Sequence, residues 1–198
     1  MAEMVSSVGY HTLTVTDVTT HAGVSRRTFY DLFTDKEACF LAAYEWCVDR
    51  LLDRVLAAYV EGDHSWPERA RAGLDALLDY CAKEPAFTRM IIVEVLAAGP
   101  TALQRRDTVL AQFTRFFQPG VSHLPPELQD LDLLPRSVVG GLYEILYQRV
   151  LNNETEQLPE ILPDLVFCAL VPFVGYERAL AESDAARGEA RETADETG

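Results

Sequence analysis

Residues 22–33 constrain the fold of this chain most, because a glycine turn is followed at once by a short amphipathic helix. Gly23 can adopt the left-handed backbone that a sharp turn between two helices needs. Ser25 suits the N-cap of the following helix, since its hydroxyl can accept a hydrogen bond from a free N–H group of the first turn. The large apolar residues of that helix fall on one face and are expected to be buried: Phe29, Leu32 and Phe33.

The opposite face of this helix carries basic and hydroxyl side chains. Arg26 and Arg27 stand side by side at its N-terminal end, where a helix that enters the major groove of DNA contacts the bases. A preceding helix is predicted over residues 14–22, with Thr14 as N-cap and Asp17 completing a capping box. Two short helices joined by a glycine turn form a helix-turn-helix. Adjacent arginines serve no packing purpose, so the pattern favours DNA binding over a purely structural hairpin.

This part of the sequence resembles the DNA-binding domain of the TetR family of transcriptional regulators. The resemblance rests on residues 9–18, 22–30 and 33–37, which occur at fixed spacing. It implies an all-α fold with an N-terminal three-helix helix-turn-helix head and a C-terminal helical domain for ligand binding and dimerisation. It also implies a repressor that binds a palindromic operator in double-stranded DNA as a homodimer and that a small-molecule effector releases.

Apolar periodicity and turn residues divide the rest of the chain into helices, with Pro172 expected to bend the last one. The predicted helices cover residues 35–61, 66–83, 86–98, 101–118, 135–152 and 159–182, and residues 121–134 form the longest irregular connection. We therefore expect three parts: a head over 1–48, a helical ligand-binding and dimerisation domain over 49–182, and a disordered acidic tail over 183–198.

The composition and charge indicate what kind of protein this chain is and how it could bind DNA. Hydrophobic residues make up 48% of it, which indicates a folded globular protein. The sequence shows no long uninterrupted apolar run and no signal peptide, so we expect a cytoplasmic protein without membrane contact. The net charge is −14, and residues 1–48 carry three basic residues against six acidic ones. Binding to DNA would therefore depend on a few well-placed contacts and weaken strongly with salt.

The predicted DNA contacts lie in and around the helix-turn-helix. We expect Arg27 to read a guanine and Arg26 to contact a base or phosphate, while Thr28 meets a thymine methyl or a phosphate. The remaining positions fix the DNA backbone by analogy with matching positions in the family: Thr14, Ser25, Tyr30 and Lys36.

The resemblance also implies an effector pocket between the middle helices. Its candidate lining residues are largely aromatic: Phe87, Met90, Ile91, Glu94, Phe113, Phe117, Tyr143 and Tyr147. Such residues are also typical of an ordinary core. Glu94 interrupts an apolar run, so it either faces solvent or is buried, where a cationic ligand would neutralise it.

The last two predicted helices resemble the dimerising pair of the family. Gly140 and Gly141 lack side chains and would allow a partner helix to approach closely. The alternative is a helical hairpin within one chain. The expected interface residues are Val139, Gly141, Leu142, Ile145, Leu165, Ala169 and Phe173.

The sequence predicts no catalytic residue, metal site or cofactor. The four histidines lack carboxylate or cysteine partners at the spacing of a metal site or catalytic triad, and the cysteines Cys39, Cys47, Cys81 and Cys168 form no CxxC pair. The family resemblance implies a full first helix, whereas eight residues precede Gly9. We therefore expect a truncated first helix that covers Val15, Val18, Phe29 and Phe33 poorly. The alternative function is a dimeric helical small-molecule-binding protein whose head this truncation impairs.

Overall fold

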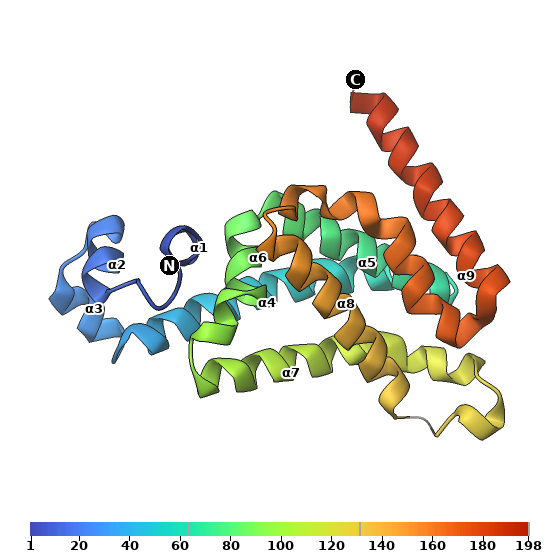
Figure 1. Ribbon diagram of the computed structural model, residues 1–198, viewed down its shortest axis with the longest axis horizontal. Helices are drawn as coiled ribbons and strands as arrows, with labels where there is room; N and C mark the ends of the chain where they lie inside the picture. The colour runs from blue at the N-terminus through green and yellow to red at the C-terminus, as the bar shows by residue number, and fades with distance from the viewer. Residues whose placement is uncertain (63, 131, 198) are drawn as a thin grey trace.

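The computed structural model describes residues 1–62, 64–130 and 132–197, with side chains described up to residue 188. These residues form nine α-helices and four short 3-10 helices (Figure 1). The α-helices are α1 (Ala2–Val8), α2 (Val15–Ala22), α3 (Arg26–Leu32), α4 (Lys36–Val60), α5 (Trp66–Lys83), α6 (Pro85–Ile92), α7 (Pro100–Phe117), α8 (Leu133–Leu151) and α9 (Leu162–Thr197). The 3-10 helices are η1 (Glu94–Ala97), η2 (Gln118–His123), η3 (Pro126–Leu128) and η4 (Thr155–Ile161).

Helix α4 joins two groups of helices. Figure 1 shows α1, α2 and α3 together at one end of the molecule, with α4 running from them into the bundle formed by the later helices. Within that bundle, α4 packs most extensively on α5, and α5 also packs on α9. This arrangement confirms the expected all-α fold with an N-terminal helix-turn-helix head.

Side-chain caps fix where the helices of the head begin. Thr14 and Asp17 form a capping box, in which the Asp17 carboxylate accepts the Thr14 N–H at 2.9 Å and the Thr14 hydroxyl accepts the Asp17 N–H at 3.3 Å. The Thr14 hydroxyl, which donates to the Asp17 carboxylate, and then the Thr14 N–H lower the pKa of Asp17. Asp35 caps α4 by accepting the N–H of Ala38 at 2.8 Å. Each cap satisfies an N–H group that the helix leaves free.

The C-terminal segment differs from the expectation in two ways. The break in α9 occurs at Gly175, whose φ of 77° is accessible to glycine, rather than at Pro172. Residues 183–188, expected to be disordered, continue the helix, because Ser183 and Ala186 are buried against the core at 1% and 0% exposure. The side chains of residues 189–198 lie outside the described part. Upstream, the helix expected over 86–98 divides into α6 and η1.

The stretch Thr155–Gly188 is long and apolar enough to cross a membrane by composition alone. In the fold, α9 instead places Val166, Ala169 and Leu170 in the protein core at 0% exposure. Core packing thus accounts for much of the apolar character of this helix.

Candidate DNA-binding head and ligand cavity

The turn between α2 and α3 presents the N-terminal end of α3 outward. Gly23 has a φ of 66°, and its N–H bonds back to the carbonyls of Thr19 and Thr20. The Ser25 hydroxyl accepts the N–H of Thr28 at 3.0 Å and caps α3. Phe29 anchors the helix at 3% exposure. The turn chemistry expected for a helix-turn-helix is therefore present.

Leu32 is a correction to the expected buried face. Its side chain is 71% exposed, whereas Phe33 is half-buried with its ring 5.4 Å from that of Phe29. Helix α3 ends at Leu32, and Phe33 then adopts an extended backbone. Because of this ending, the ring of Phe33 folds back onto Phe29 and Leu32 is left facing solvent.

The outer face of α3 carries unpaired positive charge. Arg26, Arg27 and Thr28 are exposed, and Tyr30 is 51% exposed. Among the described residues, no carboxylate lies within ion-pair distance of either guanidinium. Exposed guanidinium groups at the start of a helix are available to phosphates and to guanine edges.

Four of the expected DNA contacts already have partners within the head. The hydroxyls of Ser25 and Thr28 hydrogen-bond each other at 2.9 Å. The Lys36 ammonium donates to the carbonyls of Tyr10 and Leu13 at 2.8 and 2.9 Å, and it lies 4.1 Å from the centre of the Tyr10 ring. Lys36 thus fixes the loop before α2 and is not free for a phosphate. The Thr14 hydroxyl donates to Asp17 at 2.6 Å.

The burial of the head differs from the expectation for a short first helix. Ala2 and Val5 are buried, and α1 packs closely on α6. Val18 and Phe29 are also buried, so the expected loss of cover is wrong for these two. Val15 and Phe33 remain half-buried.

Glu94 connects the head to the helical bundle. It is 7% exposed, and its Oε2 accepts the Tyr10 N–H at 2.9 Å, while Oε1 lies 3.4 Å from Nε of Arg89. The Glu94 carboxylate is therefore buried, and because it already has partners in the protein it does not need a cationic ligand. Arg89 supplies the opposite charge from the preceding helix.

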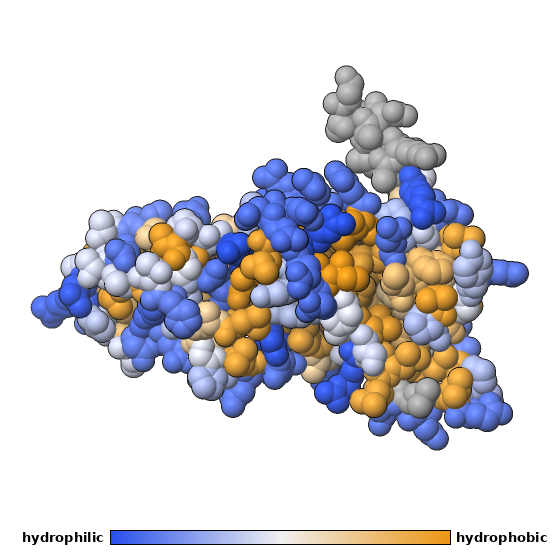
Figure 2. All heavy atoms as spheres, viewed as in Figure 1, coloured by the Kyte–Doolittle hydropathy of each residue, from blue (hydrophilic) through white to orange (hydrophobic). Residues whose placement is uncertain are grey.

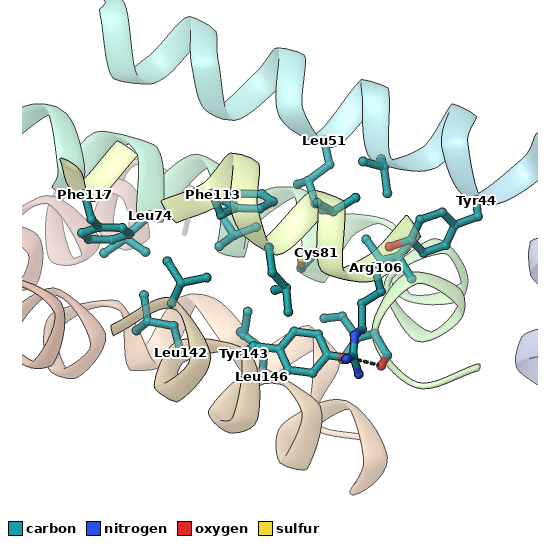
Figure 3. Close-up of a pocket in the computed structure, with 17 residues that line it drawn as sticks. Tyr44, Leu51, Leu74, Cys81, Arg106, Phe113, Phe117, Leu142, Tyr143 and Leu146 are labelled. Carbon is teal, nitrogen blue, oxygen red and sulfur yellow. Dashed lines mark hydrogen bonds between the residues drawn. The ribbon is translucent and has the colours of Figure 1, made fainter. Parts of the chain in front are cut away.

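A cavity of about 90 Å³ lies between helices α4, α5, α6, α7 and α8 (Figure 3). Of the expected ligand contacts, Ile91, Phe113, Phe117 and Tyr143 line it. The others do not: Phe87 packs its ring on Trp46 at 5.6 Å, Met90 is fully buried, and Glu94 and Tyr147 lie away from the lining.

The lining also contains Arg106 and Tyr44, which sequence reasoning missed. Arg106 precedes Phe113 and Phe117 by seven and eleven residues on α7, which places all three on one helical face. That spacing was a usable signal. Tyr44 gave none, because its position on α4 indicates only a buried face.

Comparison with known proteins identifies the head. Residues 2–43 match the family model described as bacterial regulatory proteins, tetR family. The chain belongs to the tetR family. It is accordingly a DNA-binding transcriptional regulator. No curated protein sequence matches the chain.

The fold of this tetR-family chain is similar beyond the head to a solved structure. The fatty acid degradation regulator FadR from Bacillus halodurans matches with a TM-score of 0.74 and 18% sequence identity, over 85% of this chain and 90% of that chain. At this identity the similarity establishes a shared fold.

The structure removes most of the expected dimer contacts of this tetR-family chain from the surface. Five of the seven lie in the core of the single chain at 0–7% exposure: Val139, Leu142, Leu165, Ala169 and Phe173. Val139 and Leu142 line the cavity instead. Gly141 and Ile145 remain exposed on α8. The periodic apolar residues of α8 and α9 thus pack in the core of one chain, and their periodicity does not by itself identify an interface.

Proposed function

We propose that this regulator is a repressor that binds a palindromic operator as a homodimer and is released by a small molecule bound in the cavity. The observation that carries the proposal is the pair of exposed, unpaired guanidinium groups of Arg26 and Arg27 on a capped helix. Ser25, Thr28 and Tyr30 flank them and supply hydroxyls for phosphate contacts. Since the chain carries a net charge of −14, these few groups have to supply the attraction to DNA.

The position of the cavity supports release by a ligand. Tyr44 and Val48 line it and belong to α4, the helix that carries the head. A ligand that displaced these side chains would shift α4, and with it the spacing between the two heads of a dimer. FadR is described as a regulator of fatty acid degradation. Its low identity to this chain leaves the effector of this chain to be inferred from the cavity itself.

Arg27→Ala is expected to weaken operator binding by about 1–3 kcal/mol and to relax its sequence preference, because the bidentate contact to guanine is lost. The operator would first be selected from genomic fragments with the unaltered protein, and affinities would then be measured by fluorescence anisotropy at fixed salt. Arg54→Ala is a matched control, since Arg54 is an exposed arginine on α4 outside the head. Equal losses in the two variants would contradict the assignment of Arg27.

The acidic head favours one alternative, a dimeric ligand-binding protein that does not bind DNA. Lys36 is engaged inside the head, so the reading face relies on Arg26 and Arg27 alone for positive charge. Failure of the selection to enrich any fragment above background would favour this alternative.

The proposed dimer uses the exposed face of α8 and α9. Figure 2 shows apolar side chains gathered where these two helices lie in Figure 1. Gly140 and Gly141 are exposed on α8, where Ile145 is 37% exposed, and Tyr176 on α9 is 64% exposed. A strip without side chains beside exposed apolar groups is suited to close helix packing.

Gly141→Leu is expected to shift the protein from dimer to monomer at micromolar concentration without unfolding it. A Cβ at Gly141 would meet no atom within 4 Å in the single chain, so the leucine would obstruct only a partner helix. Sedimentation velocity would report the mass and circular dichroism the helix content. A dimer of undiminished stability would place the interface elsewhere.

A further inference from the structure

We propose that the cavity binds an amphipathic ligand with an apolar body and a carboxylate head, and that Arg106 together with the hydroxyl of Tyr44 recognises that head. This inference rests on the proposed role of the cavity as the effector site. It adds the chemical class of the effector and the residues that select it.

The cavity is apolar along most of its length. Figure 3 shows it extending from Phe117 and Leu74 at one end to Tyr44 and Arg106 at the other. Arg106 and Phe117 are eleven residues apart on α7, which corresponds to about 16 Å along the helix. An elongated ligand that buries a chain against these walls fits this shape, since each buried methylene contributes about 0.8 kcal/mol.

All the charge in the lining is at one end. Among the described residues that line the cavity, Arg106 alone is charged, and its side chain is 25% exposed. Its Nε and Nη2 donate to Oδ1 of Asp107, at 3.1 and 2.7 Å. Asp107 is 64% exposed, so this pair occupies the solvent side of the guanidinium. No other described carboxylate pairs with Arg106. The guanidinium also donates a hydrogen bond to the Tyr143 hydroxyl, and the rest of its five N–H groups are left for a ligand.

Tyr44 provides a second, independent observation. The residue is 2% exposed, and its side chain lines the cavity. Figure 3 shows the Tyr44 hydroxyl pointing into the cavity. A ligand oxygen placed at this end would accept a hydrogen bond from this hydroxyl.

Tyr143 completes the polar end of the cavity. Its hydroxyl donates to the Ile92 carbonyl at 2.7 Å, and its ring lies 5.7 Å from the Arg106 guanidinium carbon. Burial raises the pKa of both Tyr44 and Tyr143, so both hydroxyls stay protonated. The polar end therefore offers the Arg106 cation and the Tyr44 hydroxyl, and the described lining contains no carboxylate, since Asp107 lies on the solvent side. This combination favours an anion over a neutral head group and disfavours an amine.

The test compares three ligands with the same chain and different heads: decanoate, 1-decanol and decylamine. Binding to the full-length protein would be measured by isothermal titration calorimetry, below the concentration at which micelles form. We expect decanoate to bind about tenfold to a hundredfold more tightly than 1-decanol, as a charge-assisted hydrogen bond would provide. Decylamine should bind most weakly.

Arg106→Met should abolish the preference for decanoate while leaving the affinity for 1-decanol within about twofold, because methionine keeps the apolar stem. Arg105→Met is the matched control, since Arg105 pairs with Glu45 on the surface and does not line the cavity. It should retain the preference. Tyr44→Phe should reduce decanoate affinity severalfold with helix content unchanged, which keeps the test valid if Arg106→Met folds poorly.

Several results would overturn the inference: equal binding of decanoate and 1-decanol, tighter binding of decylamine, no binding of any of the three, or a decanoate preference that survives Arg106→Met. Operator binding without ligand is measured separately. If the protein binds its operator but shows no head-group preference, the proposed regulatory function stands and the proposed ligand class is wrong. If the protein shows an Arg106-dependent preference but binds no operator, the proposed ligand class stands and the proposed repressor function is wrong.

Discussion

Replacing Glu94 by alanine is expected to lower the free energy of unfolding by about 3–5 kcal/mol, since removal of one partner leaves the other half of a buried ion pair without compensation. Glu94 is 7% exposed, and it is held between Arg89 and the Tyr10 N–H. The alanine variant therefore leaves a largely buried guanidinium and a buried amide unsatisfied. The free energy would be measured by urea unfolding, with hydrogen exchange reporting on the Tyr10 amide.

Two further variants isolate the cause of this loss. Glu94→Gln keeps an oxygen for the Tyr10 amide and removes the charge, so it should cost less than alanine. Glu45→Ala removes a surface carboxylate that is 49% exposed and pairs with Arg105, and should cost less than about 1 kcal/mol. If Glu94→Ala costs no more than Glu45→Ala, then the buried contact between head and bundle does not stabilise the fold.

Phe40→Ala is expected to destabilise the protein by a similar amount, about 3–5 kcal/mol, because a large buried ring is removed and a cavity is left. Phe40 is 0% exposed. Its ring centre lies 5.1 Å from that of Tyr10 in the head and 6.3 Å from that of Tyr44 at the ligand cavity. Urea unfolding followed by the fluorescence of Trp46 and Trp66 would measure the loss.

Leu56→Ala is the control for helix α4. Leu56 is 49% exposed on the same helix, and its removal should change stability by no more than about 0.5 kcal/mol. If Phe40→Ala and Leu56→Ala unfold at the same urea midpoint, the Phe40 ring is not part of a well-packed core. Phe40→Leu keeps most of the apolar volume, so its loss of unfolding free energy should lie between those of Phe40→Ala and Leu56→Ala. In the Phe40→Leu variant, any weakened response of operator binding to ligand would indicate that the three rings couple cavity and head.

The sequence by itself determined the local structure of the head and the extent of most helices. The Thr14 capping box, the Ser25 cap and the left-handed Gly23 turn each join residues only a few positions apart. Such contacts depend on the types and spacing of neighbouring residues, which the sequence states directly. Apolar periodicity likewise placed α5 at residues 66–83. The exposed arginines of α3 followed from the same periodicity.

Only the tertiary structure decided which partners the polar side chains have. It also decided what the apolar helix faces pack against. Tyr10 and Glu94 are 84 positions apart, and Lys36 reaches carbonyls 26 and 23 positions away. Periodicity shows that Val139, Leu142 and Leu165 face an apolar surface, but it does not show whether that surface belongs to the same chain or to a second copy. Five helices have to converge before Arg106 and Tyr44 meet at one end of a cavity. Contacts over such distances form only when the whole bundle packs, because each is specified by the joint position of helices and not by any one segment.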